Sequence, residues 1–400
     1  MPAMGDRAYV DHAATTPMLP AARVAWLEQS EQVGNPSSLH TSGRAARRVV
    51  EESRERIAAA LRTRPSAVVF TAGGTEADNL AVKGLFWSRR AAVGANVVLA
   101  SAIEHHAVLD PVEWLAQTQG ADVQWLPVDD RGRVHVDSLV PYLEHGAEVA
   151  LCTVMWANNE VGTVQPVHEL ADACRAAGVP FHTDAVQALG HLDVDLGELA
   201  ADAVTISSHK IGGPFGVGAL VVDPRTALTP VLHGGGQERE VRSGTLDAAG
   251  IAAFAVAVEY AVAGQAERSA RLAVLRDELI AGIREALPDA VVNGDVSAGP
   301  THRLPGNVHA SFPGCEGDLL LMLLDAAGVD CSTGSACTAG IPEASHVLLA
   351  MGVADDLARA SLRFSFGETS SQSDVDAVLA ALPGAVDRAR RAGSLAPRAV

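Results

Sequence analysis

The stretch DAVTISSHKIGGPFGVGALVVD, residues 202–223, decides the fold of this chain. Its two short apolar runs, residues 203–206 and 217–222, are bounded by turn-forming residues, which is typical of buried β-strands. Lys210 comes directly after the first run and just before a glycine-rich turn. Ligands of α/β proteins bind beyond the carboxyl ends of the strands, and glycines let a ligand approach the backbone closely. The stretch therefore predicts an amine at the ligand-binding edge of a sheet.

Apolar runs of the same kind recur from about residue 67 to residue 222. Amphipathic stretches lie between several of them, such as VHELADACRAAG, residues 167–178, whose apolar residues share one face of a helix. This alternation predicts an α/β fold with a largely parallel sheet that is covered on both faces. The predicted strands are residues 67–71, 96–101, 122–128, 148–156, 179–185, 202–208 and 217–223.

Beyond about residue 255 the pattern changes to long helices followed by shorter strands. AERSARLAVLRDELIAGIREAL, residues 266–287, is the clearest helix. NVHASF, residues 307–312, and SLRFSF, residues 361–366, have the length and pattern of strands. We therefore expect a second, smaller α+β domain in this part of the chain.

Composition and charge exclude several classes of function. The 400 residues are 48% hydrophobic, which is enough for a large core, and the formal net charge of −18 would repel nucleic acids and anionic membranes. No apolar run approaches the roughly 18 residues of a membrane span, and the start of the chain lacks the apolar core of a signal peptide. We expect a cytoplasmic protein that binds small molecules or other proteins. Its five cysteines, an odd and sparse set, predict reduced thiols.

Lysine is scarce in this sequence, since only Lys83 and Lys210 are present. Arginine never gives up its proton and cannot form a Schiff base, so an aldehyde cofactor would need one of these two amines. Lys210 lies at a predicted strand end, whereas Lys83 lies about two turns inside a predicted helix and is expected on the surface. The alternative for Lys210 is a solvated cation in a loop.

Asp184 ends another predicted strand, in the stretch VPFHTDAVQALG, and Gln187 follows three residues later. A buried carboxylate at this place would hold a proton on a ring nitrogen. In pyridoxal phosphate, that proton makes the pyridine ring an electron sink. The alternative for Asp184 is the N-cap of a helix.

The stretch VVFTAGGTEADNLAVKG, residues 68–84, leads from a strand through Gly73, Gly74 and Thr75 into a helix. Small residues at a helix start expose backbone N–H groups at its positive end, which favours a phosphate. Thr75 would add a hydroxyl group. Ser207 and His209, from the strand that precedes Lys210, are expected to close this phosphate site.

Two further strand ends carry side chains that suit a flat cofactor. One of His105 and His106 can stack on a ring and move protons, because the pKa of histidine lies near working pH, and the other is expected on a helix surface. Asn158 and Asn159, in WANNEVGT, can hydrogen-bond a ring hydroxyl, although taken alone they also indicate a turn.

Together these stretches resemble the cysteine desulfurases of the class V aminotransferase family, which are fold type I pyridoxal phosphate enzymes. The resemblance covers nearly the whole chain, through YVDHAATTP, GNPSSLH, TAGGTEADNLAVKG, EHHAVLD, NNEVGT, DAVQALG, SSHKIGGP, GGGQEREVRSGT, STGSACTAG and LRFSFG. It departs from the common pattern at His12, where asparagine or tyrosine is usual, and at the second glycine of TAGGTE; neither change removes a catalytic group.

The resemblance implies a large domain over residues 16–260 with a mostly parallel seven-stranded sheet. Residues 1–15 and 261–400 would form the small α+β domain.

The resemblance also implies roles in binding the cofactor pyridoxal phosphate. Lys210 would form the Schiff base, His105 would stack on the ring, and Asp184 would hold the pyridine nitrogen. Gln187 or Asn159 would lie near the phenolic oxygen. The phosphate would be held by Gly74, Thr75, Ser207 and His209.

Three further implied roles concern the substrate and a second subunit. Arg363 would clamp the carboxylate of L-cysteine with its planar fork, and Asn35 would lie in a loop on the substrate side. Thr245 would complete the phosphate site of the partner subunit, so the resemblance implies a homodimer.

The stretch STGSACTAG, residues 332–340, places Cys337 among residues with small side chains. In the resembled family the matching cysteine takes the sulfur of L-cysteine as a persulfide, leaves alanine, and passes the sulfur to acceptor proteins such as an iron–sulfur scaffold. A thiol that must reach the cofactor and later an acceptor needs a mobile loop, here about residues 330–342. Cys331 is the rival nucleophile, but its strand-like position predicts a structural role.

Other functions give different expectations for the same residues. The irregular spacing of Cys315, Cys331, Cys337 and His346 lacks the paired ligands of a zinc site, so we predict no metal. A selenocysteine lyase would keep the cofactor residues but depend less on Cys337. Another class V aminotransferase or a kynureninase would not need that thiol. A sulfur-relay protein without catalysis would not need the intact Lys210, Asp184 and His209.

Overall fold

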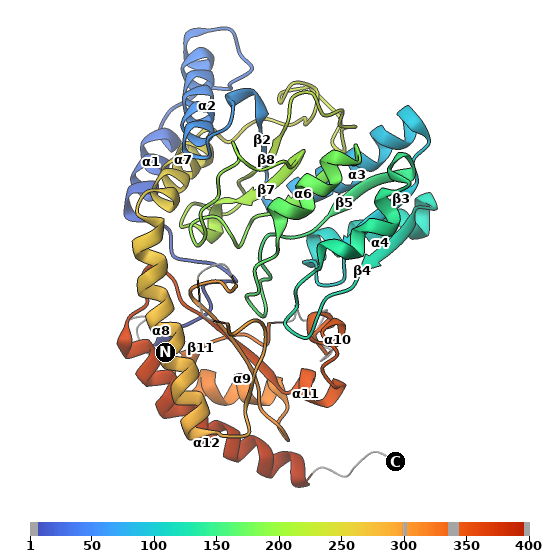
Figure 1. Cartoon of the computed structure of the whole chain (residues 1–400). Coiled ribbons are helices and arrows are strands. Elements are labelled where there is room, and N and C mark those ends of the chain that lie inside the picture. Colours follow the sequence, from blue (N-terminus) through green and yellow to red (C-terminus); the bar gives the residue numbers. More distant parts are fainter. Residues whose placement is uncertain (1–6, 298, 300–301, 335–343, 396–400) are drawn as a thin grey trace.

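The computed structural model describes residues 7–297, 299, 302–334 and 344–395, and a seven-stranded sheet forms its larger half (Figure 1). The strands lie in the order β2-β8-β7-β6-β5-β3-β4. All seven strands predicted from the sequence are present, with slightly shorter bounds. They are β2 (Val68–Thr71), β3 (Val97–Ser101), β4 (Asp122–Leu126), β5 (Val149–Thr153), β6 (Phe181–Asp184), β7 (Ala203–Ser207) and β8 (Gly218–Val222).

The direction of the strands follows from their connections. Strands β4, β3, β5, β6 and β7 are parallel, so their carboxyl ends meet at one edge of the sheet, while β8 runs antiparallel to both β7 and β2. Helices cover both faces, which is why every residue of β5, β6 and β7 is buried. This arrangement confirms the predicted α/β fold with a mostly parallel sheet.

Two layers of helices enclose this sheet. Helices α3 (Gly74–Val93) and α4 (His106–Gln119) pack on one face, where Leu80, Phe86 and Val112 are buried. Helices α2 (Thr41–Ala60), α6 (Val167–Ala176) and α7 (Ala248–Val262) pack on the other. The remaining short helices of this half are α1 (Pro20–Ser30), α5 (Val140–Leu143), η2 (Pro65–Ala67), η3 (Val136–Leu139), η4 (Gly146–Glu148) and η5 (Ser208–Lys210).

The C-terminal half forms a second core around a three-stranded antiparallel sheet in the order β12-β10-β9. The predicted strands at residues 307–312 and 361–366 are its β10 and β12, which confirms an α+β arrangement. The first described strand joins this half, because β1 pairs in parallel with β11. The domain boundaries near residues 16 and 260 stay predictions. The elements are β1 (Ala8–Tyr9), β9 (Val291–Val292), β10 (Asn307–Ser311), β11 (Val329–Asp330), β12 (Ser361–Ser365), α8 (Gln265–Ala286), α9 (Gly317–Ala326), α10 (His346–Ala350), α11 (Asp355–Arg359) and α12 (Gln372–Leu395).

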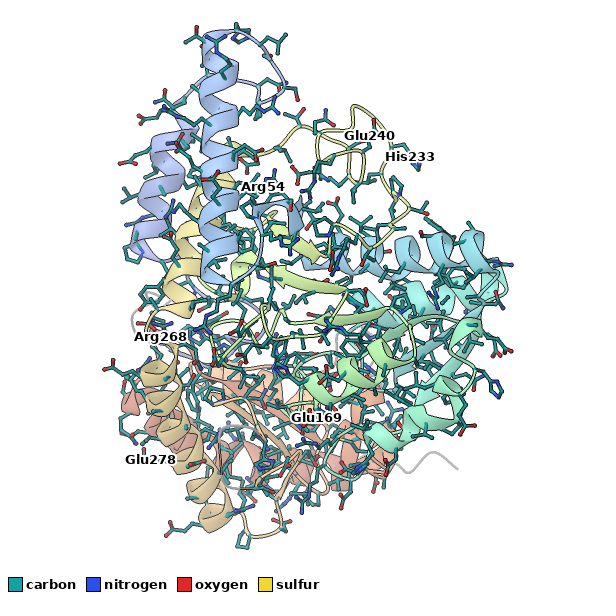
Figure 2. All side chains as sticks on the ribbon, turned by 45° about the horizontal axis from the view of Figure 1, so that its top comes forward. Arg54, Glu169, His233, Glu240, Arg268 and Glu278 are labelled. Atoms are coloured by element: carbon teal, nitrogen blue, oxygen red, sulfur yellow. The ribbon has the colours of Figure 1, made fainter. Side chains whose placement is uncertain are left out.

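Arg268 joins the two halves at the bend between α7 and α8 (Figure 2). Its guanidinium donates to the carbonyls of Tyr260, Ala261 and Ala263, which lie at or just beyond the C-terminal end of α7, and so satisfies carbonyls that the helix leaves unpaired. The two helices meet at 72°. Among the described residues no single helix is long and apolar enough to cross a membrane, although α7 and α8 taken together pass that test by length and composition.

A buried ion pair fixes the long loop between β8 and α7. In Figure 2 Arg54, on α2, lies near the loop that carries His233 and Glu240. Arg54 is 6% exposed and donates from both terminal nitrogens to Glu238, which is 1% exposed, at 2.8 and 2.7 Å. Glu238 also accepts from the backbone N–H of Phe70 at 2.9 Å. The next two residues, Arg239 and Glu240, have φ of 52° and 62°, a costly conformation for side chains of this kind.

Arg54→Ala is expected to destabilise the protein by about 3–5 kcal/mol, because it leaves the Glu238 carboxylate buried without its cation. Chemical denaturation of the purified protein measures this loss. Arg56→Ala, on the same helix, is the matched control. Its partner Glu259 is 44% exposed, so the expected loss is below about 1 kcal/mol. Equal losses in the two variants would contradict this account of the loop.

Candidate active site

A cavity of about 250 Å³ lies at the carboxyl ends of the parallel strands. This volume is slightly smaller than the range of about 300–1,000 Å³ that is usual for small-molecule pockets. The structure brings together here, in one chain, nearly all the cofactor residues that the sequence predicted. The lining residues are Gly74, Thr75, Asp78, His105, Ala107, Met155, Asn159, Asp184, Val186, Gln187, Ser207, His209 and Lys210.

Asp184 is the last residue of β6 and is 6% exposed. Burial raises the pKa of its carboxyl to about 6, although the backbone N–H of Val186, at 2.8 Å from Oδ1, and the charge of Lys210 both favour the ionised form. A turn, not a helix, follows this strand, so the alternative of an N-cap is wrong. A carboxylate held in such a place stabilises a cationic group beside it.

Lys210 follows β7 at the end of the short helix η5. Its Nζ donates to the carbonyls of Ala13 and Ala14 at 2.6 and 2.8 Å. Burial lowers the pKa of Lys210 to about 8, and the charge of Arg363 lowers it further, whereas Asp184 opposes the shift. This environment contradicts the alternative of a solvated loop cation, and it leaves about a tenth of the amine neutral at pH 7.

The start of α3 forms a site that fits an anion. Gly73 has a φ of +147°. A methyl group on Gly218 would lie 2.7 Å from the backbone of Gly73, so the absence of a side chain at Gly218 permits the two backbones to approach closely. The helix that begins at Gly74 is 20 residues long, and its first N–H groups have no partner within the helix. Ser207 is 3% exposed, and its Oγ has no hydrogen-bond partner. An unpartnered buried hydroxyl beside a helix N-terminus is what a phosphate would satisfy.

His209 lies beside this anion site. Its Nδ1 lies 3.3 Å from Thr15 Oγ1, and its ring stacks on Phe215 with centroids 5.3 Å apart. Burial, followed by the charge of Lys210, lowers the pKa of His209 to about 4. The ring is therefore neutral at pH 7 and can donate one hydrogen bond.

His105 is the N-cap of α4, and its Nδ1 accepts from the backbone N–H of Ala107 at 3.1 Å. In the neutral ring the proton is therefore on Nε2. Burial lowers the pKa of His105 to about 4, with a further effect of Lys210. The expectation of a pKa near working pH is wrong, because the loss of water around the ring disfavours its charge. His106 pairs with Asp110 at 2.9 Å on the helix surface, as expected for the second histidine.

The two asparagines of WANNEVGT have different positions. Asn158 is fully buried and its Oδ1 accepts from the backbone N–H groups of Glu160 and Val161, so it holds the turn. Asn159 lines the cavity. The Nε2 of Gln187 donates to the carbonyl of Ala13 at 2.9 Å, the same carbonyl that Lys210 contacts.

Arg363 lies on β12 and is 4% exposed. It donates to Asp11 Oδ1 at 2.8 Å and to the carbonyl of Asn159 at 3.0 Å, while its buried Nε has no partner. Through Asn159 this arginine reaches the edge of the cavity.

Asn35 and Thr245 do not join the cavity within this chain. Both are exposed, in the α1–α2 connection and in the β8–α7 loop respectively. Their implied roles, Asn35 toward the substrate and Thr245 toward a second subunit, stay predictions. Cys337 lies outside the described residues.

Cys331 is buried, and burial raises the pKa of its thiol to about 12, with a further effect of Asp11. It remains a thiol at neutral pH, in agreement with a structural role.

Among the residues that the structure describes, no group of three or more metal-ligating side chains is found. Lys83, expected as an ordinary surface lysine, instead lies half-buried with its Nζ 4.6 Å from the ring centre of Trp114.

Sequence reasoning missed two buried acids, Asp78 in the cavity and Glu104 beside it. Asp78 lines the cavity at 1% exposure, and its Oδ1, 3.6 Å from His182 Nε2, has no hydrogen-bond partner. Burial and the charge of Asp184 raise the pKa of Asp78 well above its usual range. Burial also raises the pKa of Glu104, beside His105, to about 8. The available signal for Asp78 was its position four residues after Gly74, on the same face of α3.

Comparison with known proteins identifies the family. The family model for Aminotransferase class-V matches residues 8–378, so the chain belongs to that family. It is 54% identical over 386 residues to an IscS-like cysteine desulfurase of Mycobacterium tuberculosis, with 96% of this chain and 98% of the relative covered. A solved NifS-like protein is 32% identical with a TM-score of 0.86, covering 96% of this chain and all of that one. SspA, solved in complex with cysteine, is 31% identical with a TM-score of 0.74, covering 90% of this chain and 98% of that one.

The lowered pKa of Lys210 predicts how the rate of cofactor uptake depends on pH. Only the neutral amine attacks an aldehyde, so the rate at which cofactor-free protein takes up pyridoxal phosphate is expected to rise with pH, with a midpoint of about 8. Stopped-flow absorbance measures this rate. Arg363→Met is expected to move the midpoint upward, because it removes a positive charge that disfavours the ammonium form. Arg359→Met changes an arginine that pairs with the exposed side chain of Asp355, and it is expected to leave the midpoint in place. A wild-type midpoint near the ordinary lysine value of about 10.4 would contradict the burial of this amine.

Proposed function

We propose that the chain is a cysteine desulfurase that uses pyridoxal phosphate to move sulfur from L-cysteine to Cys337. The observation that carries this proposal is the cavity in which a lysine amine, a buried carboxylate and an anion site occur together. Membership of the class V aminotransferase family supports the cofactor. The names of the relatives, together with the cysteine complex of SspA, support the substrate.

The residues of the cavity fit this cofactor. Lys210 would attach its aldehyde, Asp184 its pyridine nitrogen, and Ser207, His209, Thr75 and the N-terminus of α3 its phosphate. Gln187 or Asn159 would lie near its phenolic oxygen, and the neutral ring of His105 would stack on its face. When bound, pyridoxal phosphate supplies an electron sink that weakens the bond between carbon and sulfur in the substrate.

Side chains of the protein would bind the substrate, move protons and accept the sulfur. Arg363 would bind the carboxylate of L-cysteine, and Asn35 would lie in a loop on the substrate side. Lys210, with its pKa lowered to about 8, can take up a proton and return it near neutral pH. His105, with its pKa lowered to about 4, is the weaker base for the same transfer. L-Cysteine and the thiol of Cys337 give L-alanine and a persulfide on Cys337, so that one sulfur atom is transferred and all atoms and electrons balance.

Partners and location complete the proposal. A homodimer would let Thr245 of one subunit reach the phosphate site of the other. The persulfide would pass to sulfur-acceptor proteins, such as an iron–sulfur scaffold, for cluster or thio-cofactor synthesis. A cytoplasmic location stays a prediction.

Cys337→Ser is expected to abolish the formation of alanine from L-cysteine, and of sulfide when a thiol reductant is added, while the absorbance of the bound cofactor stays near its wild-type position. The serine hydroxyl cannot form a persulfide, whereas the cofactor residues are untouched. Alanine analysis and a visible spectrum of the same sample measure the two effects. Cys331→Ser is the matched control and is expected to keep activity, because that thiol is buried and protonated. Full activity in Cys337→Ser with loss in Cys331→Ser would reassign the nucleophile.

A further inference from the structure

Asp78 is a buried acid of the cavity that none of the steps above uses. It lies on α3 four residues after Gly74, so the two residues line the cavity from the same face of the helix. Asp78 is 1% exposed, and its Oδ1 has no hydrogen-bond partner. Its state of ionisation therefore decides how much negative charge the cavity carries.

The strands that α3 covers bring polar side chains close to Asp78. His182 and Asp184 lie two residues apart on β6, so their side chains are on one face of the sheet. Thr205 of β7 pairs with Asp184 and shares that face. His182 Nε2 lies 3.6 Å from Asp78 Oδ1 and 3.1 Å from Thr205 Oγ1. Asp78 and Asp184 are therefore on the same side of the sheet, and each is within the electrostatic reach of the other.

The groups around Asp78 do not balance a negative charge on it. His182 is neutral at pH 7, because burial lowers its pKa to about 3. The carboxyls of Asp184 and Glu104 both disfavour the ionised form of Asp78. A hydrogen bond with the Thr205 hydroxyl favours that form, but burial outweighs this effect. Asp78 therefore retains its proton more readily than an acid in water.

Asp184 is the better place for a charge in the same cavity. The charge of Lys210 and a backbone N–H at 2.8 Å both favour its ionised form. His105 and His209, the remaining titratable residues of the cavity lining, are neutral at pH 7. Two buried carboxyls in one site do not readily ionise together, because like charges repel each other strongly away from water. The negative charge therefore falls on Asp184 and the proton on Asp78.

We propose that Asp78 is a positioning residue that shares one negative charge with Asp184: Asp78 holds the proton, so the charge lies where the ring nitrogen of the cofactor would lie. This inference rests on the proposed binding of pyridoxal phosphate. An ionised Asp78 would instead place a negative charge near the start of α3, where it would repel the phosphate. If Asp184 is neutralised, Asp78 releases its proton to solvent and carries the charge in its place.

The test measures how tightly the full chain, freed of cofactor, binds pyridoxine 5′-phosphate at pH 7 in a calorimeter. This probe has the ring nitrogen and the phosphate but no aldehyde, so no reaction with Lys210 contributes. Asp184→Asn is expected to weaken binding about tenfold, because it removes a charged partner of the ring nitrogen. Asp78→Asn, the matched neutral replacement, is expected to change binding by less than about twofold, because the acid that it replaces is already neutral.

The combined variant separates charge sharing from the absence of any role. Asp78→Asn added to Asp184→Asn is expected to weaken binding by about a further threefold or more, because no acid is left to take the charge. Asp110→Asn, which changes an acid whose side chain is 66% exposed on α4, is expected to match the wild type.

Infrared spectra of the same proteins give a second readout, which serves if Asp78→Asn does not fold. Asp184→Asn is expected to reduce the carbonyl band of protonated carboxyl groups, because Asp78 then loses its proton, whereas Asp110→Asn leaves the band unchanged. Equal weakening by Asp78→Asn and Asp184→Asn, a combined variant no weaker than Asp184→Asn, or an unchanged band in Asp184→Asn would overturn the sharing of charge. A wild-type protein that does not bind pyridoxine 5′-phosphate would overturn the proposed cofactor, and this inference with it.

Discussion

The burial of a carboxylate and an amine at one sheet edge is the constraint on which the rest of this structure depends. Asp184 comes from β6 and Lys210 from the short helix η5 after β7, and these two strands are adjacent and parallel, with Asp184 opposite Thr205. Raising the pKa of Asp184 from about 4 to about 6 corresponds to about 3 kcal/mol against its ionised form. A positive group beside this carboxylate would offset that cost.

The segment before α1 connects the second core to this edge. It begins in β1, which pairs with β11, and Ala13 N donates to Ser365 Oγ on β12 at 2.9 Å. The carbonyl of the same residue, Ala13, accepts from both Lys210 and Gln187. Arg363, also on β12, reaches the carbonyl of Asn159. The cavity is therefore formed by one half of the molecule, while the other half fixes the polar groups at its rim.

The sequence predicted the sheet well because its central strands are buried on both faces and therefore appear as continuous apolar runs. Polar residues such as Asp184 and Lys210, directly after such runs, indicated where the site would lie. The roles of Arg363 and Thr245 came from the resemblance alone, since no local pattern marks them.

The buried acids and the neutral histidine could not be predicted from the sequence, for one common reason. Asp78 and Glu104 are acids, and acids are expected in water unless tertiary packing buries them. The neutral state of His105 likewise results from the loss of water around its ring, which no local pattern records.

Borohydride reduction of the purified holoenzyme, followed by peptide mapping, tests the central claim most directly. The account predicts that the cofactor is fixed to the peptide that contains Lys210 and that the peptide with Lys83, the other lysine of the chain, is unmodified. A cofactor fixed to Lys83, or to no lysine, would contradict it.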